Sequence, residues 1–345
     1  MNYNKSTILT SVSAALLGAM LVSGPALGAE FSACQVTDTG GIDDKSFNET
    51  AWNGVLEAEK RLGVKGRYIE SAAETDYEAN IGSLLGGKCN IIITVGFLLG
   101  DATEKAAKAN PNQQFSIVDY SYNPPMGNVL SQTFATDEAA FLAGYLAAGT
   151  TKTKFVGVFG GLNIPPVTIF MDGFFYGVEH YNKTKGTNVT VLGWDARKKH
   201  GLFTNNFSSL DDGRSYAQNL FDEGADIILP VAGPVGLGSA ALAVEKGVDK
   251  LKIIGVDADL YKTNPEQKQV YLTSILKRMN VTTVNVIEAS KNGTFKGGEF
   301  RGTLANGGVD ISPFYGFDAS ISAGMKSELA AIRKGISDGS IKIGG

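Results

Sequence analysis

Carboxylates, aromatic rings and one lysine follow segments of this sequence that resemble buried β-strands. The candidate ligand-binding residues are Asp44, Phe47, Asn48, Gly96 and Asp119 in the first half, and Phe207, Gly233, Asp257 and Lys277 in the second half. Carboxylates accept hydrogen bonds from hydroxyl groups, a lysine donates them, and aromatic rings stack on a flat ring. The set therefore suits a polar ring compound that carries hydroxyl groups.

The richest of these stretches is residues 38–48, which lie between a strand-like segment at 33–37 and a helical pattern at 49–62. In an open parallel sheet such a loop lies at the carboxyl end of a strand, where ligands of α/β proteins bind. Gly40 and Gly41 allow a sharp turn close to a ligand. Ser46 and Glu49 have the spacing of a capping box, so we expect the Ser46 side chain to open the helix.

A weak internal repeat organises the elements that carry these residues. The apolar strand that ends at Gly96, with Asp119 after the next strand, is echoed by the strand that ends at Gly233, with Asp257 after its successor. The repeat extends upstream, because Gly40-Gly41 corresponds to Gly160-Gly161, and Trp52-Asn53-Gly54-Val55 corresponds to Phe175-Tyr176-Gly177-Val178. Apolar strands that alternate with amphipathic helices indicate parallel sheets covered on both faces. We therefore predict an α/β fold of two doubly wound parallel-sheet lobes with a ligand cleft between them.

The predicted division of the chain follows from its length and from one polar stretch. At 345 residues the chain is long for one domain. We expect a signal peptide at residues 1–29, a first lobe at 30–150 joined by part of 278–345, and a second lobe at 151–277, with the boundary in the polar stretch 150–154. Which lobe holds the remainder of 278–345 stays open.

The first residues indicate export. Lys5 supplies a positive start, residues 8–22 are apolar but too short and interrupted for a good membrane span, and residues 26–29 are a small-residue cleavage region. We expect no membrane span in the mature chain. The net charge of −4, with no basic run longer than Arg197-Lys198-Lys199, gives no electrostatic footprint for nucleic acid.

Two cysteines allow two interpretations in an oxidising compartment. Cys34 and Cys89 begin two strands at the same end, so a disulfide between them is possible if the strands are neighbours. The alternative makes Cys34 a lipid attachment site, because residues 31–34 loosely resemble a lipobox. An exported protein that is not anchored needs an outer membrane to retain it. We therefore expect a periplasmic location, with a membrane-anchored lipoprotein as the alternative.

Five stretches in order resemble the basic membrane protein family, the purine nucleoside receptor-like substrate-binding proteins of ABC importers. They are residues 38–48, 94–97, 231–238, 254–257 and 273–277, and the resemblance covers essentially the whole mature chain. It implies a type I periplasmic binding protein-like clamp that binds a nucleoside, most simply a purine nucleoside. The implied partners are an ABC permease and ATPase, and a monomer is expected without cofactor, metal or catalytic residue.

The resemblance also implies roles for individual side chains. Phe47 and a ring of the second lobe, Phe207 or else Phe203, would sandwich the base. Asp44 and Asn48 would read its edge, and Asp119, Asp257 and Lys277 would hold the ribose.

Two alternatives to a nucleoside-binding protein remain. A sugar-binding protein of the same fold would change only the ligand. Residues 38–44 also resemble the calcium-binding loop of nucleoside hydrolases, but Gly40 stands where that loop has a carboxylate, which weakens a cation site. The two histidines, His180 and His200, lie outside the strand-end loops, so we expect no enzyme.

Overall fold

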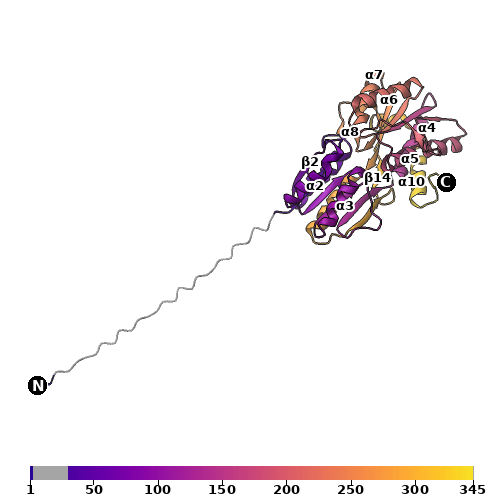
Figure 1. Ribbon diagram of the computed structural model, residues 1–345. Helices are drawn as coiled ribbons and strands as arrows, with labels where there is room; N and C mark the ends of the chain where they lie inside the picture. The colour runs from indigo at the N-terminus through magenta and orange to yellow at the C-terminus, as the bar shows by residue number, and fades with distance from the viewer. Residues whose placement is uncertain (3–29, 345) are drawn as a thin grey trace. The chain divides into compact units, whose positions relative to one another are not determined.

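The structure is a computed structural model that describes residues 1–2 and 30–344. The signal peptide expected at residues 1–29 lies outside the described residues, apart from Met1 and Asn2. Residues Phe31–Gly345 form one compact unit, which holds two six-stranded sheets (Figure 1).

The first sheet is parallel throughout, in the order β13-β5-β4-β3-β1-β2. Its strands are β1 (Ser32–Val36), β2 (Lys65–Ile69), β3 (Ile91–Val95), β4 (Gln114–Val118), β5 (Val129–Phe134) and β13 (Gly298–Gly302). β3 is buried along its whole length. Ile91 and Ile93 pack into the core on one face and Ile92 into the core on the other, as expected for a strand covered on both sides.

The second sheet has the corresponding order, β14-β12-β11-β10-β6-β7. Its strands are β6 (Phe155–Gly160), β7 (Thr190–Leu192), β10 (Ile227–Val231), β11 (Lys252–Asp257), β12 (Tyr271–Lys277) and β14 (Val309–Ile311). β14 runs antiparallel to β12, so this sheet is mixed at one edge. A separate ribbon pairs β8 (Trp194–Asp195) with β9 (His200–Gly201).

Helices cover both faces of both sheets, as predicted. α1 (Phe47–Leu62) packs with α9 (Met279–Lys291), and α2 (Tyr77–Gly86) with α3 (Gly100–Ala109), around the first sheet. α4 (Thr136–Thr150) packs with α5 (Pro165–Lys185), and α6 (Leu210–Asp222) with α7 (Val235–Lys246), around the second sheet (Figure 1). The other helices are α8 (Leu260–Thr263), α10 (Ala323–Ser337) and 3₁₀ turns at Glu74–Asp76, Phe97–Leu99, Lys268–Val270 and Tyr315–Ser320.

Two helices join the sheet opposite to the one that precedes them in the chain. α4 follows β5 of the first sheet but packs against α5, β12 and β14. α9 follows β12 of the second sheet but packs against α1 and β3 to β5. The sequence assigned residues 30–150 to the first lobe, and the structure instead places α4 on the second sheet. The last segments also divide, because β13 joins the first sheet and β14 the second.

The repeated glycines explain how these crossing helices are accommodated. A side chain at Gly54 of α1 would meet the backbone of α9 at the Asn280 carbonyl, 2.6 Å away. A side chain at Gly177 of α5 would collide with the Phe141 carbonyl of α4. The echo between residues 52–55 and 175–178 therefore marks equivalent close contacts between helices in the two halves.

Cys34 and Cys89 are joined by a disulfide, with their Cα atoms 6.0 Å apart. The strands are neighbours, as the pairing requires, because Cys34 of β1 lies in register with Ile92 of β3. Both side chains are buried. The alternative expectation of a lipid on Cys34 conflicts with this arrangement, because a sulfur in a disulfide cannot carry a thioether.

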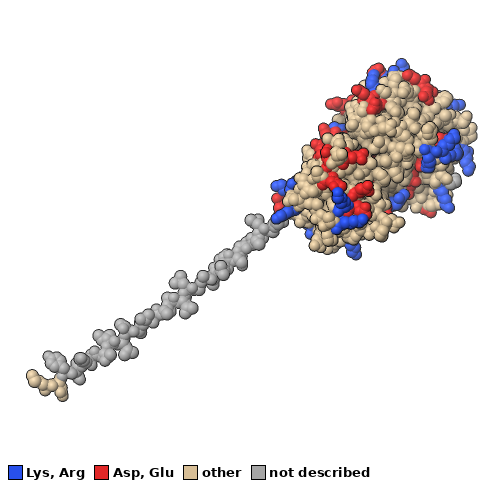
Figure 2. Space-filling view, viewed as in Figure 1, with Lys and Arg blue, Asp and Glu red and all other residues tan. Residues whose placement is uncertain are grey.

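Two surface properties bear on partners. Among the described residues, no helix is both long and apolar enough to cross a membrane. On the face shown in Figure 2, basic and acidic side chains are interspersed, and basic groups do not merge into one stripe. This distribution agrees with the absence of a long basic run in the sequence.

Candidate functional site

The carboxyl ends of both sheets contribute to one cavity, and all nine predicted ligand-binding residues line it. These are Asp44, Phe47, Asn48, Gly96, Asp119, Phe207, Gly233, Asp257 and Lys277. Twelve further residues complete the lining: Asp38, Gly40, Phe97, Leu98, Ile164, Pro166, Val167, Phe170, Val231, Ala232, Pro234 and Val256. The strand-end rule thus brings together residues that are more than 200 positions apart in the sequence.

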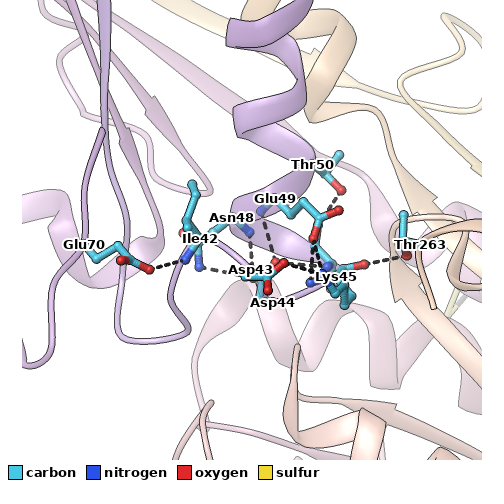
Figure 3. Close-up of polar contacts among 10 residues, drawn as sticks. Ile42, Asp43, Asp44, Lys45, Asn48, Glu49, Thr50, Glu70 and Thr263 are labelled. Atoms are coloured by element: carbon cyan, nitrogen blue, oxygen red, sulfur yellow. Dashed lines mark hydrogen bonds and ion pairs between the residues drawn. The ribbon is translucent and has the colours of Figure 1, made fainter. Parts of the chain in front are cut away.

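Asp44 closes the first turn of α1. Its two carboxylate oxygens accept the backbone N–H groups of Ser46 (3.0 Å), Asn48 (2.8 Å) and Glu49 (3.0 Å), and also Nδ2 of Asn48 (3.2 Å) (Figure 3). A carboxylate offers about four lone-pair sites, so Asp44 has none to spare for a ligand. Burial raises the pKa of Asp44 to about 7, although the three backbone donors oppose this shift.

The capping box expected at Ser46 and Glu49 is wrong, because neither of its two reciprocal bonds forms. Ser46 is the N-cap residue, but its side chain makes no capping bond. Glu49 Oε2 accepts the backbone N–H of Lys45 at 3.1 Å, whereas the N–H of the N-cap residue Ser46 is donated to Asp44. Asp44 caps the helix in place of Ser46, because its side chain lies two residues earlier and contacts the free N–H groups of the first turn.

Asp38 and Asn48 form a buried polar pair beside the cap. Asn48 Nδ2 donates to Asp38 Oδ1 at 2.7 Å, and the Gly40 N–H donates to the same oxygen at 2.9 Å. Asp38 lines the cavity, and within the described part of the chain no hydrogen bond involves its Oδ2. Burial raises the pKa of Asp38, as do Asp119 and Asp257, while its bonds with Asn48 and Gly40 lower it.

The strand-end residues of the repeat share an unusual backbone conformation. Asp119 and Asp257 are left-handed, with φ of 66° and 65°, and the preceding loop glycines Gly96 and Gly233 also have positive φ. A non-glycine residue in this region costs about 1–3 kcal/mol and persists where the surrounding structure demands it, commonly at functional sites. The repeat therefore preserves the conformation of these residues as well as their type.

A lysine between two aspartates forms one end of the cavity. Lys277 Nζ lies 2.7 Å from Asp119 Oδ2 and 3.4 Å from Asp257 Oδ1, and the three side chains are at most 8% exposed. The same ammonium lies 4.9 Å from the ring centre of Phe47 and 5.2 Å from that of Phe170. Burial opposes the charge on Lys277, but the two carboxylates outweigh it and the pKa is raised. This end can therefore donate to and accept from adjacent hydroxyl groups.

The loop between β9 and α6 contributes Phe207 to the cavity, and Phe203 is engaged elsewhere. Phe203 packs edge-on against Trp194, with ring centres 5.8 Å apart. A side chain at Gly161 would collide with the Phe207 ring, so this glycine makes room for it. The choice between the two rings, which the sequence left open, is therefore decided in favour of Phe207 as the ring that lines the cavity.

One wall of the cavity went unnoticed in the sequence. Ile164, Pro166, Val167 and Phe170 line it from the start of α5. Apolar residues at helical spacing are more commonly core than ligand contacts, and Val167 and Phe170 are indeed buried. Pro165-Pro166 could have indicated this wall, because proline is common in the first turn of a helix. The residues that follow it then lie at the start of α5, next to the strand-end loops.

Comparison with known proteins gives a consistent relationship. The family model described as "ABC transporter substrate-binding protein PnrA-like" matches residues 31–338. The chain is 32% identical to the "ABC transporter nucleoside-binding protein BmpA" of Lactococcus lactis, over 91% of this chain and 89% of the relative. It is 31% identical to "Basic membrane protein A" of Borreliella burgdorferi, over 79% and 76%.

A solved structure agrees with the fold. A solute-binding protein of an ABC transporter system from Aeropyrum pernix superposes with a TM-score of 0.82 at 25% identity, covering 90% of this chain and 92% of that chain. The predicted fold class of two α/β lobes around a cleft is confirmed. The chain belongs to the Bmp family of PnrA-like ABC transporter substrate-binding proteins.

Proposed function

We propose that this protein is the extracytoplasmic nucleoside-binding component of an ABC importer, with a purine nucleoside as its ligand. The Lactococcus lactis relative is named for nucleoside binding. The cavity supports the same ligand class, because it combines aromatic rings from both lobes with a charged group at one end. The protein would hand its ligand to permease and ATPase subunits without altering it.

The observation that carries this proposal is the position of Lys277 between Asp119 and Asp257. A ribose presents adjacent hydroxyl groups that both donate and accept hydrogen bonds, and this arrangement offers partners for both. The base would then lie between Phe47 and Phe207, which line the cavity from different lobes. Stacking against such rings contributes about 0.5–1.5 kcal/mol beyond burial.

The edge of the base would be read by Asp38 in place of Asp44. Both carboxylates line the cavity, but Asp44 already accepts four donors from α1. Oδ2 of Asp38 is available, and a carboxylate oxygen accepts the N–H groups of a purine edge. Asn48 would hold Asp38 in place through its 2.7 Å bond.

The disulfide supports an exported protein, because such bonds persist in oxidising compartments. Since Cys34 is bonded and buried, we propose a periplasmic protein with no lipid on Cys34.

A thermal-shift screen with nucleosides, free bases and sugars tests the function. A ligand that binds only the folded state stabilises it by roughly 2.7 kcal/mol at 100 times its dissociation constant. We expect purine nucleosides to raise the melting temperature. Asp119→Ala should abolish the shift, and the surface variant Asp222→Ala on α6 should retain it.

Two outcomes would overturn the proposal. A shift with ribose or galactose but with no nucleoside would indicate a sugar-binding protein. Release of free base from an incubated nucleoside, followed by chromatography, would indicate a hydrolase.

A further inference from the structure

We propose that Ser46, together with Thr263, is a positioning residue for ligand binding, which ties the first loop to the second lobe across the cleft. This inference rests on the proposed function. Neither side chain lines the cavity. Their contribution would come from holding the ligand-contacting residues of both lobes in the closed arrangement.

The hydroxyl of Ser46 is free for this role because Asp44 caps α1. Ser46 Oγ donates to the backbone carbonyl of Val256 at 2.9 Å and lies 3.3 Å from Asp257 Oδ2. The serine is 1% exposed, so water does not compete for the bond. A serine at an N-cap position normally accepts from its own helix. Here it instead links α1 of the first lobe to β11 of the second.

Thr263 makes a second bond of the same kind in the opposite direction. At the end of α8 in the second lobe, its Oγ1 donates to the carbonyl of Lys45 at 2.6 Å (Figure 3). Lys45 is left-handed, with φ of 59°. This conformation is costly for a lysine and persists where other contacts hold it. The strained residue presents its carbonyl to the opposite lobe.

The two bonds lie next to the residues that would contact the ligand. Ser46 directly precedes Phe47, and Val256 directly precedes Asp257. Both bonds must break when the lobes separate, so they favour the closed state over the open one. A ligand that binds only the closed state gains affinity from any such difference. Loss of a bond should therefore speed ligand release, with little effect on association.

This mechanism makes a distinctive prediction about specificity. Ser46 would not touch the ligand, so its loss should weaken adenosine, inosine and guanosine by the same factor. A residue that reads the base would instead change the ratio between these nucleosides. A uniform loss is therefore the signature of a positioning residue.

The test compares Ser46→Ala, Ser46→Thr and Thr263→Val with the wild-type protein. Affinities for adenosine, inosine and guanosine would come from calorimetry, and release rates from stopped-flow fluorescence. We expect Ser46→Ala to weaken each nucleoside about fivefold, mainly through faster release, which corresponds to about one lost hydrogen bond. Ser46→Thr keeps the hydroxyl and should restore most of the affinity, and Thr263→Val should resemble Ser46→Ala.

Ser239→Ala is the matched control. Ser239 is also fully buried, and its Oγ donates to the Gly213 carbonyl at 2.8 Å, but both residues belong to the second lobe. This variant should lose stability without losing affinity. If Ser46→Ala and Thr263→Val bind within twofold of Ser239→Ala, the inference is wrong. If the wild-type protein binds no nucleoside, the proposed function fails and this inference falls with it.

Discussion

Residues 38–48 (the first loop) and 160–170 (the second loop) join the first strand of each lobe to the helix after it and include the start of that helix. They correspond in the repeat but form unlike walls of the cavity. In the first loop, Gly40 lies against the polar pair, so that an added side chain would come 3.1 Å from Asn48 Nδ2 and 3.2 Å from Asp38 Oδ1. In the second, Gly160 and Gly161 make room for the rings of Phe203 and Phe207. The corresponding pairs of glycines thus make room for carboxylate and amide groups in the first lobe and for aromatic rings in the second.

The next strand ends have stayed alike. Asp119 and Asp257 share a left-handed backbone and both face Lys277. The comparison indicates that the duplicated scaffold keeps a symmetric charged end, while its loops have diverged into a polar wall and an apolar wall. We expect the symmetric end to hold the ribose, and the unlike walls to determine which base is bound.

We expect the largest effect from removing Lys277, the cation that lies between Asp119 and Asp257. Lys277→Met leaves two buried carboxylates without their cation, and loss of one partner of a buried pair costs about 3–5 kcal/mol. We expect nucleoside affinity to fall by at least about a hundredfold, or roughly 2.7 kcal/mol. Calorimetric titration and urea unfolding of the same variant measure both effects.

Lys252→Met is the control for that substitution. Lys252 also lies on a strand of the second lobe and is 9% exposed, but it does not line the cavity. It should leave affinity unchanged. Equal affinity in Lys277→Met and Lys252→Met would remove Lys277 from the site.

The disulfide separates the two lobes in a second way, because the only two cysteines of the chain both belong to the first lobe. The cross-link spans 55 residues, and it should stabilise the protein by roughly 4 kcal/mol in the chain-entropy model. We compare the double variant Cys34→Ser, Cys89→Ser with the wild-type protein. Loss of the disulfide should accelerate amide-proton exchange more in β3 and β4 of the first sheet than in β10 and β11 of the second.

Reductant should lower the stability of the wild-type protein and leave the double variant unaffected. Equal acceleration of exchange in both sheets would contradict a lobe-specific effect. Two titratable thiols in protein purified from the exported fraction would contradict the bond itself.

Gly161→Ala tests whether the second loop differs from the first by making room for an aromatic ring that contacts the ligand. The added methyl group collides with the Phe207 ring, so the ring must shift away from its place in the cavity. We expect affinity to fall about tenfold, or about 1.4 kcal/mol. Gly127→Ala is the matched control, since no atom lies within 4 Å of an added methyl group there. Unchanged affinity in Gly161→Ala would show that Phe207 does not stack on the ligand.

Much of this site was predictable from the sequence, because the position of a residue after a parallel strand determines which edge of the sheet it occupies. All nine predicted residues line the cavity, and this rule accounts for those that follow strands of the two six-stranded sheets. Phe207 instead follows β9 of the separate ribbon. The role of Asp44 was harder to predict, because two aspartates, a serine and a glutamate near a helix start all suit a cap. The crossing of α4 and α9 was also missed, because chain order favours packing on the preceding sheet. Gly54 and Gly177, which stand at matching positions of the repeat, were a trace of it.

The smallest expected effect is on the pH dependence of folding stability, in which the two loops again differ. Residues 38–48 contain buried carboxylates, whereas residues 160–170 contain no acidic residue. Burial raises the pKa of Asp38, and it raises that of Asp44 to about 7, from an ordinary value of 3.8. Between about pH 4 and 7 the folded Asp44 therefore holds a proton that the unfolded chain has lost, and Asp38 also keeps its proton to a higher pH in the folded state than in the unfolded chain. Stability from these groups is present at low pH and is lost as the pH rises toward 7.

The contribution is at most about 1.4 kcal/mol per pH unit for each group. Urea unfolding of the ligand-free protein at pH 5, 6, 7 and 8 measures it, and Asp38→Asn should flatten the dependence. His180 acts in the opposite sense, because burial and Lys183 lower its pKa, so the difference between variant and wild type is the relevant quantity. Asp222→Asn should retain the wild-type profile. If Asp38→Asn and Asp222→Asn give the same profile, the Asp38 carboxylate does not take up a proton in this range, and the pH dependence of stability does not come from Asp38.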